Sequence, residues 1–207
     1  MRPLPLTPVI VDEQEARWLQ LARTGDGDAF RQLVDRHQGR VARTVLGMLG
    51  EQDADDVAQE VFIRLHRHMH EFRGEAKLGT WLTRVAINLC LDRLRARQRR
   101  QWRWLSLHSE EGQRLEPALD GEALLDARER QALVRRAVQE LKPEWRAVVV
   151  LRWLEGLSTE ETADLLQLPY GTVLSRLSRA MKALGRELAP LLKAAPVQRE
   201  GMGGERA

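Results

Sequence analysis

Apolar positions recur every three or four residues over most of the chain, which is typical of amphipathic helices. This pattern runs from about Glu13 to Arg100, with breaks near Thr24–Asp28, Gly50–Asp53 and Arg73–Thr80. It resumes from about Asp126 to Leu192. Long stretches of the period-two alternation that marks strands are not found. The sequence therefore predicts an all-α fold.

A segment of different character separates the two helical stretches. From Leu105 to Arg130 there are seven acids against three arginines, and two glycines and a proline interrupt the segment. If flexible, the linker would have a root-mean-square span of about 25–30 Å and a stretched reach of roughly 80 Å. We therefore expect two small helical domains joined by a flexible linker. The expected divisions are an N-terminal extension (1–19), a first domain (20–100), the linker (101–125), a second domain (126–192) and a disordered tail (193–207).

The second domain contains the pattern of a helix-turn-helix. Ser158 and Glu161 have the spacing of a capping box at a helix start, and the helix breaks around Gln167–Pro169. A new helix begins near Tyr170, and its apolar residues form one buried stripe. From Tyr170 to Arg186 there are four basic residues and no acid. Thr172, Ser175 and Arg176 lie at its N-terminal end, where the second helix of such a motif presents side chains to the major groove. The alternative is a helical hairpin with a solvated basic face.

Another helix precedes this motif and opens with Pro143 in its first turn, after Lys142. It continues to Leu154, and its aromatic and aliphatic residues are expected to pack under the helix-turn-helix. Four tryptophans of the chain occupy apolar positions of helices and are expected in the core: Trp18, Trp81, Trp145 and Trp153.

The first domain carries an acidic helix followed by a basic one. Glu51–Glu60 has five acids and no base, whereas Trp81–Trp104 has seven arginines against one aspartate. Acids at a helix start favour the helix dipole, but an exposed acidic stripe could also dock a basic partner. Arginines beside Trp102 and Trp104 suit a phosphate backbone and stacked bases, although a solvated charge run is the alternative. The face opposite the acidic helix's apolar residues carries Asp56, Gln59, Glu60 and Ile63, and one face of the basic helix carries Arg84, Asn88, Arg95 and Arg99.

Composition adds limits to this picture. The 207 residues carry 33 basic and 30 acidic side chains, and the net charge of +3 does not by itself indicate a nucleic-acid partner. The single cysteine, Cys90, excludes an internal disulfide. No apolar run has the length of a signal peptide or of a bilayer span, so we expect a soluble, cytoplasmic protein without membrane insertion.

The motifs occur in one order along the chain. They are Asp-Ala-Phe (28–30), Asp-Ala-Asp-Asp-Val-Ala-Gln-Glu-Val-Phe (53–62), Phe-Arg-Gly (72–74), Thr-Trp-Leu-Thr-Arg-Val-Ala-Ile-Asn (80–88), Asp92 with Arg95, and Gly-Thr-Val-Leu-Ser-Arg-Leu-Ser-Arg-Ala (171–180). In this order and spacing they resemble an extracytoplasmic-function (ECF) sigma factor, the small type of sigma-70 factor that keeps only regions two and four. The resemblance covers about residues 20–100 and 126–190.

The resemblance implies transcription initiation without catalysis or a cofactor in this chain. Region two would bind the clamp helices of the polymerase β′ subunit through Asp56, Gln59, Glu60 and Ile63. It would also help melt the −10 element and hold a flipped base, through Phe72, Arg84, Asn88, Arg95 and Arg99. Region four would read the −35 element through Thr172, Ser175, Arg176 and Arg179. The partners implied are core RNA polymerase (β′ and β subunits), promoter DNA and an anti-sigma factor.

Two residues depart from the family pattern. Leu174 stands where the family usually has Lys or Arg, which removes one candidate DNA contact. Gln167 stands where a glycine often ends the first helix of the motif, and a left-handed conformation there would cost about 1 kcal/mol.

Two other classes of function remain as alternatives. A regulator could use the helix-turn-helix without polymerase, but it would not need the acidic stripe. An enzyme would need a reactive centre, and His66, His68 and His70 are the only histidine cluster. His66 and His70 have zinc-compatible spacing, but no third ligand is apparent, so we expect no metal site. Cys90 lacks an activating base and is expected to be a packed small side chain.

Overall fold

The computed structural model describes residues 12–72, 77–107 and 127–194, and within these ranges it contains helices and no strand. The sequence-based prediction of an all-α fold is confirmed for these residues. None of their helices is long and apolar enough to cross a membrane. The elements are α1 (Glu13–Arg23), α2 (Gly27–Leu49), α3 (Ala54–His68), α4 (Leu78–Leu107), α5 (Ala127–Glu140), α6 (Pro143–Val149), the π-helical turn η1 (Val150–Leu154), α7 (Thr159–Leu166) and α8 (Tyr170–Ala194).

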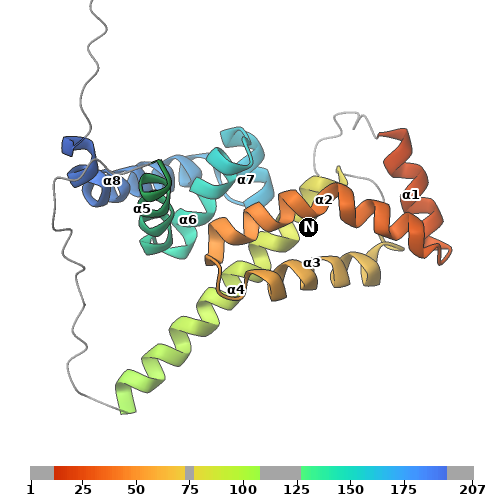
Figure 1. Ribbon diagram of the computed structural model, residues 1–207, viewed down its shortest axis with the longest axis horizontal. Coiled ribbons are helices and arrows are strands. Elements are labelled where there is room, and N and C mark those ends of the chain that lie inside the picture. Colours follow the sequence, from red (N-terminus) through yellow and green to blue (C-terminus); the bar gives the residue numbers. More distant parts are fainter. Residues whose placement is uncertain (1–11, 73–76, 108–126, 195–207) are drawn as a thin grey trace, which may run out of the picture.

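The first four helices pack around α2, which lies at the centre of the molecule (Figure 1). Asp12 and Asp26 accept backbone N–H groups at the starts of α1 and α2, which satisfies donors that a helix leaves open at that end. Gly50 ends α2 with a φ of 72°, a conformation that glycine adopts without strain. The expected breaks near Thr24–Asp28 and Gly50–Asp53 are therefore confirmed.

Helix α4 buries one stripe and then leaves the body of the molecule. Its buried positions include Leu82, Ile87, Cys90 and Leu94, so the expectation for Cys90 is confirmed. Burial raises the pKa of the Cys90 thiol to about 12. The C-terminal part of α4 projects away from the other helices (Figure 1), and α4 ends at Leu107 rather than near Arg100. Residues 101–107 of the expected linker (101–125) belong to α4, and residues 193–194 of the expected tail (193–207) belong to α8. The rest of the linker and of the tail lies outside the described residues.

The last helices form the helix-turn-helix and the elements beneath it. Ser158 and Glu161 form the predicted capping box, with each side chain bonded to the other residue's backbone N–H. Gln167 ends α7 in the left-handed region, at φ 54° and ψ 46°, so this non-glycine residue does adopt the conformation that costs about 1 kcal/mol. Val148, Ala163 and Val173 form a small core that joins α6, α7 and α8.

The π-helical turn corrects one expectation for the core. The side chains of Trp153 and Leu154 are each 51% exposed, so the placement of Trp153 in the core was wrong. The extra residue per turn in η1 shifts the positions that follow it out of the regular helical stripe. Trp18, Trp81 and Trp145 are partly buried against hydrophobic clusters, which agrees with the prediction for those three.

Candidate nucleic-acid interface

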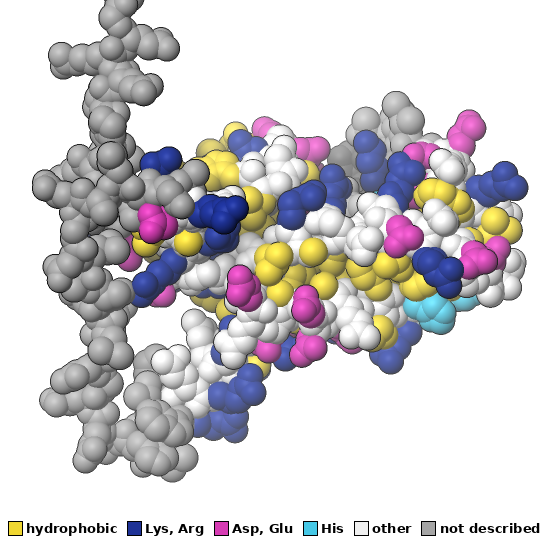
Figure 2. All heavy atoms as spheres, viewed as in Figure 1, with side chains coloured by type: hydrophobic (Ala, Val, Ile, Leu, Met, Phe, Trp, Pro, Cys, Tyr) yellow, Lys and Arg dark blue, Asp and Glu magenta, His cyan; other side chains and the backbone are white. Residues whose placement is uncertain are grey.

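One exposed face of α4 carries four of the polar residues singled out in the sequence. Asn88 and Arg99 are exposed, Arg84 is half-buried, and the Arg95 side chain is 54% exposed. Arg95 Nη1 lies 3.2 Å from Asp92 Oδ1, a surface ion pair between residues three apart. Arg side chains gather on the projecting part of α4 (Figure 2), so this part presents positive charge to solvent.

Part of the basic helix is neutralised by the acidic segment before α3. Asp53 Oδ2 lies 2.5 Å from Arg97 Nη2, and Asp53 Oδ1 lies 3.9 Å from Arg93 Nη1. Asp53 adopts a left-handed φ of 63° at the start of α3. Two of the arginines counted in the basic run therefore tie α4 to the start of α3, and this pairing holds the two helices together at the base of the projection.

Phe72 lies four residues after the end of α3, and it is the last described residue before 73–76. Its ring packs edge-on against Trp81, with 6.1 Å between the ring centroids. Arg23, the last residue of α1, donates from Nε to the Met69 carbonyl oxygen at 2.7 Å and from Nη2 to the Phe72 carbonyl oxygen. Sequence reasoning missed Arg23, because an arginine at a helix end is usually a surface residue.

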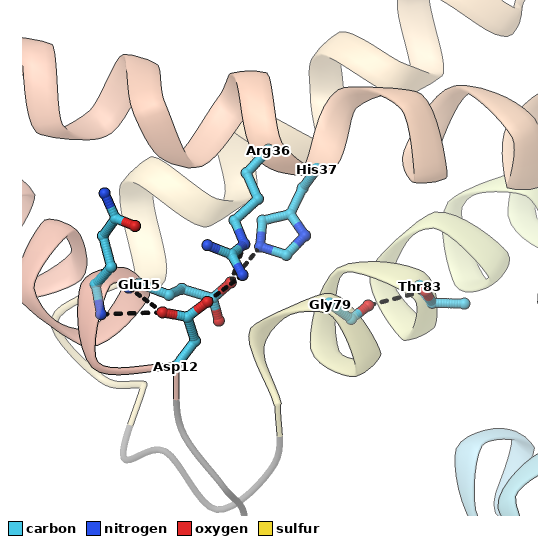
Figure 3. A network of polar contacts seen from close by, with 7 residues as sticks. Asp12, Glu15, Arg36, His37, Gly79 and Thr83 are labelled. Carbon is cyan, nitrogen blue, oxygen red and sulfur yellow. Dashed lines mark hydrogen bonds and ion pairs between the residues drawn. The ribbon is translucent and has the colours of Figure 1, made fainter.

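A polar network holds α1 against α2 close to the start of α4 (Figure 3). His37 Nε2 lies 2.9 Å from Glu15 Oε2, and Arg36 pairs with both Asp12 and Glu15. Burial lowers the pKa of His37, although the Glu15 carboxylate opposes that shift. The Arg36 side chain, hydrogen-bonded to Asp12, lowers the pKa of that carboxyl group.

Glycine permits the close approach of α4 to this network. A Cβ at Gly79 would lie 2.8 Å from Arg40 Nη1 and 3.5 Å from the His37 ring. The Thr83 hydroxyl, one turn later, donates to the Gly79 carbonyl oxygen at 2.8 Å. The first turn of α4, which precedes the basic face, is therefore seated directly on α2.

The start of α8 presents the four polar residues predicted for groove recognition. Ser175 and Arg179 are exposed, and Thr172 and Arg176 are partly so. On the other side, Val173, Ala180 and Leu184 are buried, as the stripe predicted. Leu174 is 44% exposed on this helix, so its apolar side chain stands among the polar ones.

The outer face of α3 carries the four residues of the predicted acidic stripe. Asp56 and Gln59 are exposed, and the Ile63 side chain is 36% exposed. Glu60 Oε1 lies 3.2 Å from Arg64 Nε, and the Glu60 side chain remains 37% exposed. Val57, Val61 and Leu65 are buried on the opposite face. The structure therefore places the stripe where a partner can contact it.

Comparison with known proteins agrees with this arrangement. Residues 33–100 match the family model of sigma-70 region 2, and residues 125–184 match that of sigma-70 region 4. The RNA polymerase sigma-H factor of Pseudomonas aeruginosa is 34% identical over 194 residues, which are 90% of this chain and 100% of the relative. The ECF RNA polymerase sigma-E factor of Escherichia coli K12 is 34% identical over 180 residues, 84% of this chain and 94% of the relative.

The chain belongs to the sigma-70 family, as an ECF sigma factor.

Solved structures share the fold of this sigma factor. CnrH in complex with the cytosolic domain of CnrY is 26% identical, covers 87% of this chain and 98% of its own, and superimposes with a TM-score of 0.58. RpoE from Bartonella quintana, solved with the anti-sigma factor NepR, is 21% identical and covers 77% of this chain and 96% of its own, with a TM-score of 0.56. As an alternative sigma factor, the chain directs promoter-specific transcription initiation by RNA polymerase.

The histidine cluster of the sigma factor has structural partners. The His66 ring packs edge-on against Phe30, with 5.2 Å between centroids, and His68 Nδ1 lies 3.3 Å from Glu71 Oε2. Among the described residues, no group of three or more His, Cys, Asp or Glu side chains could hold a metal ion.

One residue of the α4 face has a partner that the sequence did not predict. Arg84 Nη2 donates to the backbone carbonyl oxygen of Asp164, in α7, at 3.0 Å. The contact joins the two domains, and no local sequence pattern signals it because the two residues are 80 positions apart.

Proposed function

We propose that this sigma factor uses three separate helix faces for its three tasks. The outer face of α3, with Asp56, Gln59, Glu60 and Ile63, would bind the clamp helices of the polymerase β′ subunit. The observation that supports this division is that each face carries exposed or half-buried polar side chains, while the opposite side of the same helix packs in a core. A sigma factor must meet polymerase and DNA at once, and the three faces lie on three different helices, α3, α4 and α8.

The −10 element would be held by the exposed face of α4 and by the aromatic pair before it. Opening a duplex costs a few kcal/mol for each unstacked base, and stacking on an aromatic ring returns about 1–3 kcal/mol per base. Phe72 packs against Trp81 at the start of this face, so an aromatic surface adjoins the polar residues. In this proposal Asn88 and Arg84 contact the flipped base, and Arg95 and Arg99 contact phosphates.

The −35 element would be read by the start of α8 in the major groove. Thr172, Ser175, Arg176 and Arg179 cover the first turns of this helix, the part that contacts base edges in helix-turn-helix proteins. Arginine donates two parallel hydrogen bonds to guanine, so Arg176 is the strongest candidate for a base contact. Leu174 offers no hydrogen bond and would meet a thymine methyl group instead.

Domain boundaries and partners belong to the same proposal. Residues 20–100 and 126–192 would form the main part of the two domains, with α1 extending the first domain back to Glu13 and α4 extending it to Leu107, so that the connection begins after Leu107. RpoE from Bartonella quintana is solved with the anti-sigma factor NepR, and CnrH is solved with the cytosolic domain of CnrY. We infer an anti-sigma partner for this chain as well. The chain would act on cytoplasmic DNA, and the polymerase would supply all catalysis.

Transcription in vitro tests this proposal. Core polymerase with the purified chain is expected to give transcripts from a limited set of genomic fragments, and mapping their 5′ ends defines the −10 and −35 elements. Asn88→Ala should abolish start sites by blocking melting, with Gln98→Ala on the same helix as the matched control. Arg176→Ala should relax or weaken −35 recognition, with Lys182→Ala on α8 as its control. If both variants kept the wild-type start sites and yields, the proposed contacts would be wrong.

A binding experiment separates this function from that of a DNA-binding regulator that works without polymerase. The full chain should form a stable complex with core polymerase, and a charge reversal at Asp56 should weaken it. A charge reversal at Asp55, exposed on the same helix outside the proposed face, is the control. A chain that does not bind core would contradict the proposal.

A further inference from the structure

Arg23, the last residue of α1, joins this helix to the segment that leaves α3. Its Nε donates to the Met69 carbonyl oxygen at 2.7 Å, and its Nη2 donates to the Phe72 carbonyl oxygen. Met69 is the C-cap of α3, where the last carbonyls have no partner within the helix and carry partial negative charge. One guanidinium group therefore holds both ends of the segment from Met69 to Phe72.

The chemistry of arginine suits this bridge better than that of lysine. A guanidinium group is planar and presents several donors in fixed directions, whereas an ammonium group is a single nitrogen on a flexible chain. Arg23 is half-buried, and two of its three guanidinium nitrogens donate to the two carbonyls. The side chain is therefore occupied in fixing backbone rather than free to reach a phosphate.

The segment that Arg23 holds ends in a ring that contacts α4. Phe72 packs against Trp81 with 6.1 Å between the ring centroids and an angle of 73° between the ring planes, an edge-to-face arrangement. We call these two residues the aromatic pair. Trp81 lies three residues before Arg84 and seven before Asn88, which are about one and two turns of the helix. The aromatic pair thus adjoins the face proposed to hold the flipped base.

Helix α1 is itself fixed at its other end. Arg36 of α2 pairs with Asp12 and Glu15, and His37 Nε2 lies 2.9 Å from Glu15 Oε2 (Figure 3). Leu19 and Ala22 are buried near the end of the helix. Arg23 cannot leave its two carbonyls together with α1 unless these contacts break. Helix α1 nevertheless lies before residue 33, where the match to sigma-70 region 2 begins.

We propose that Arg23 is a positioning residue for −10 recognition, which fixes the Phe72 ring against Trp81 and so prepares the aromatic surface on which the flipped base stacks. The inference rests on the proposed function, because Phe72, Arg84 and Asn88 are taken there as contacts of the −10 element. Arg23 acts through Phe72 and does not touch DNA. Without Arg23, the DNA strand must order the ring as it binds, and this lowers the affinity.

Fluorine NMR of the full chain tests whether Arg23 positions the ring. The chain has three phenylalanines, so labelling with para-fluorophenylalanine gives three resonances, and Phe72→Leu assigns the one that belongs to residue 72. The ring current of Trp81 should displace this resonance from its position in the unfolded chain. Arg23→Met should move it toward that position. Arg17→Met, which removes an exposed arginine from the same helix, is the control and should leave it in place.

Binding of the −10 strand tests the consequence for recognition. Core polymerase is assembled with the full chain, and the probe is a fluorescent oligonucleotide with the non-template −10 strand of a mapped promoter. Arg23→Met should weaken binding by about tenfold, the size expected for partial loss of one stacked base. Arg23→Lys should lie between Arg23→Met and wild type, because one nitrogen can serve one carbonyl. Arg17→Met should match wild type, and all three variants should bind core as wild type does.

Two further measurements separate positioning from a direct phosphate contact. A lost phosphate contact would make the dependence of log affinity on log salt shallower by about 0.7, whereas loss of a positioning residue should leave this slope unchanged. The double variant of Arg23→Met with Phe72→Ala should bind no more weakly than Phe72→Ala alone, because Arg23 acts through the ring that this variant lacks.

Four results would overturn the inference. They are an unmoved resonance of residue 72 in Arg23→Met, a shallower salt dependence, additive losses in the double variant, and unchanged binding by Arg23→Met when Phe72→Ala weakens it. If Phe72→Ala itself left binding unchanged, the proposed contact by Phe72 would fail instead, and the resonance would still decide whether Arg23 holds the ring. Should Arg23→Met fold poorly, Arg23→Lys takes its place in each measurement, with smaller changes in the same directions.

Discussion

Arg146 connects α6 to the end of α2, and replacing it by methionine should cost several kcal/mol of stability. Arg146 is only 6% exposed. Burial lowers the pKa of its guanidinium group to about 10, so the side chain remains protonated at neutral pH. Methionine keeps an unbranched chain of similar length and removes the charge and the donors. The change therefore tests the hydrogen bonds with little loss of packing.

The magnitude follows from the carbonyl groups that Arg146 satisfies. It donates to the carbonyl oxygens of Met48 at 2.5 Å, Leu141 at 3.0 Å and Gln139. Helix α2 ends at Leu49, so the Met48 carbonyl has no later N–H partner within the helix. The Leu141 carbonyl is also left open, because the N–H of Trp145 bonds to the Lys142 carbonyl instead. Each carbonyl left without a donor costs about 1–3 kcal/mol, and removing the buried charge returns part of this. We expect a net loss of about 3 kcal/mol.

Urea unfolding followed by circular dichroism at neutral pH measures this loss in the free energy of unfolding. In thermal unfolding the same change of about 3 kcal/mol corresponds to a fall in Tm of about 6–12 °C for a chain of this size. Arg135→Met, at an exposed position of α5, is the control and should change stability by less than about 0.5 kcal/mol. A loss below about 1 kcal/mol for Arg146→Met would refute the reasoning, because the carbonyls would then have other partners.

Three further predictions concern single groups. Burial lowers the pKa of His37 below the ordinary histidine pKa of 6.5. As the pH drops through 6.5, the unfolded chain therefore binds the proton more readily than the folded chain does, and the folded chain loses stability. Between about pH 7 and pH 5 the Tm should therefore fall more steeply in wild type than in His37→Gln, and parallel curves would contradict this. The Cys90 thiol should react with a chromogenic thiol reagent only after unfolding, since burial raises its pKa to about 12; rapid reaction of the folded chain would count against it. Ser158→Ala should cost about 1 kcal/mol through the loss of the capping box, and an unchanged unfolding midpoint would show that the cap does not matter.

Local patterns in the sequence predicted much of the fold. The apolar stripe of α8, the capping box of α7 and the break around Gln167 each depend on residues within a few positions of one another. Such signals can be read without the tertiary structure because helix caps and buried stripes have fixed spacing. The outer face of α3 was predicted in the same way, from the position of its apolar residues.

The remaining features depend on contacts that spacing does not reveal. Trp153 is exposed because η1 departs from the regular helical period, and the sequence shows no sign of that turn. Arg146 is buried where the Met48 carbonyl, 98 positions away along the chain, accepts one of its hydrogen bonds. Asp53 meets Arg97 across two helices, so the acidic and basic blocks partly neutralise each other. Each of these requires the packed structure.

The most direct test of the account is the permanganate reactivity of thymines in the −10 element of a mapped promoter. Core polymerase with the wild-type chain should make these thymines reactive, whereas core alone should not. Asn88→Ala should remove the reactivity while the Gln98→Ala control keeps it. Reactive thymines without the chain, or unreactive ones with it at a promoter that it transcribes, would contradict the claim that this ECF sigma factor melts the −10 element through α4.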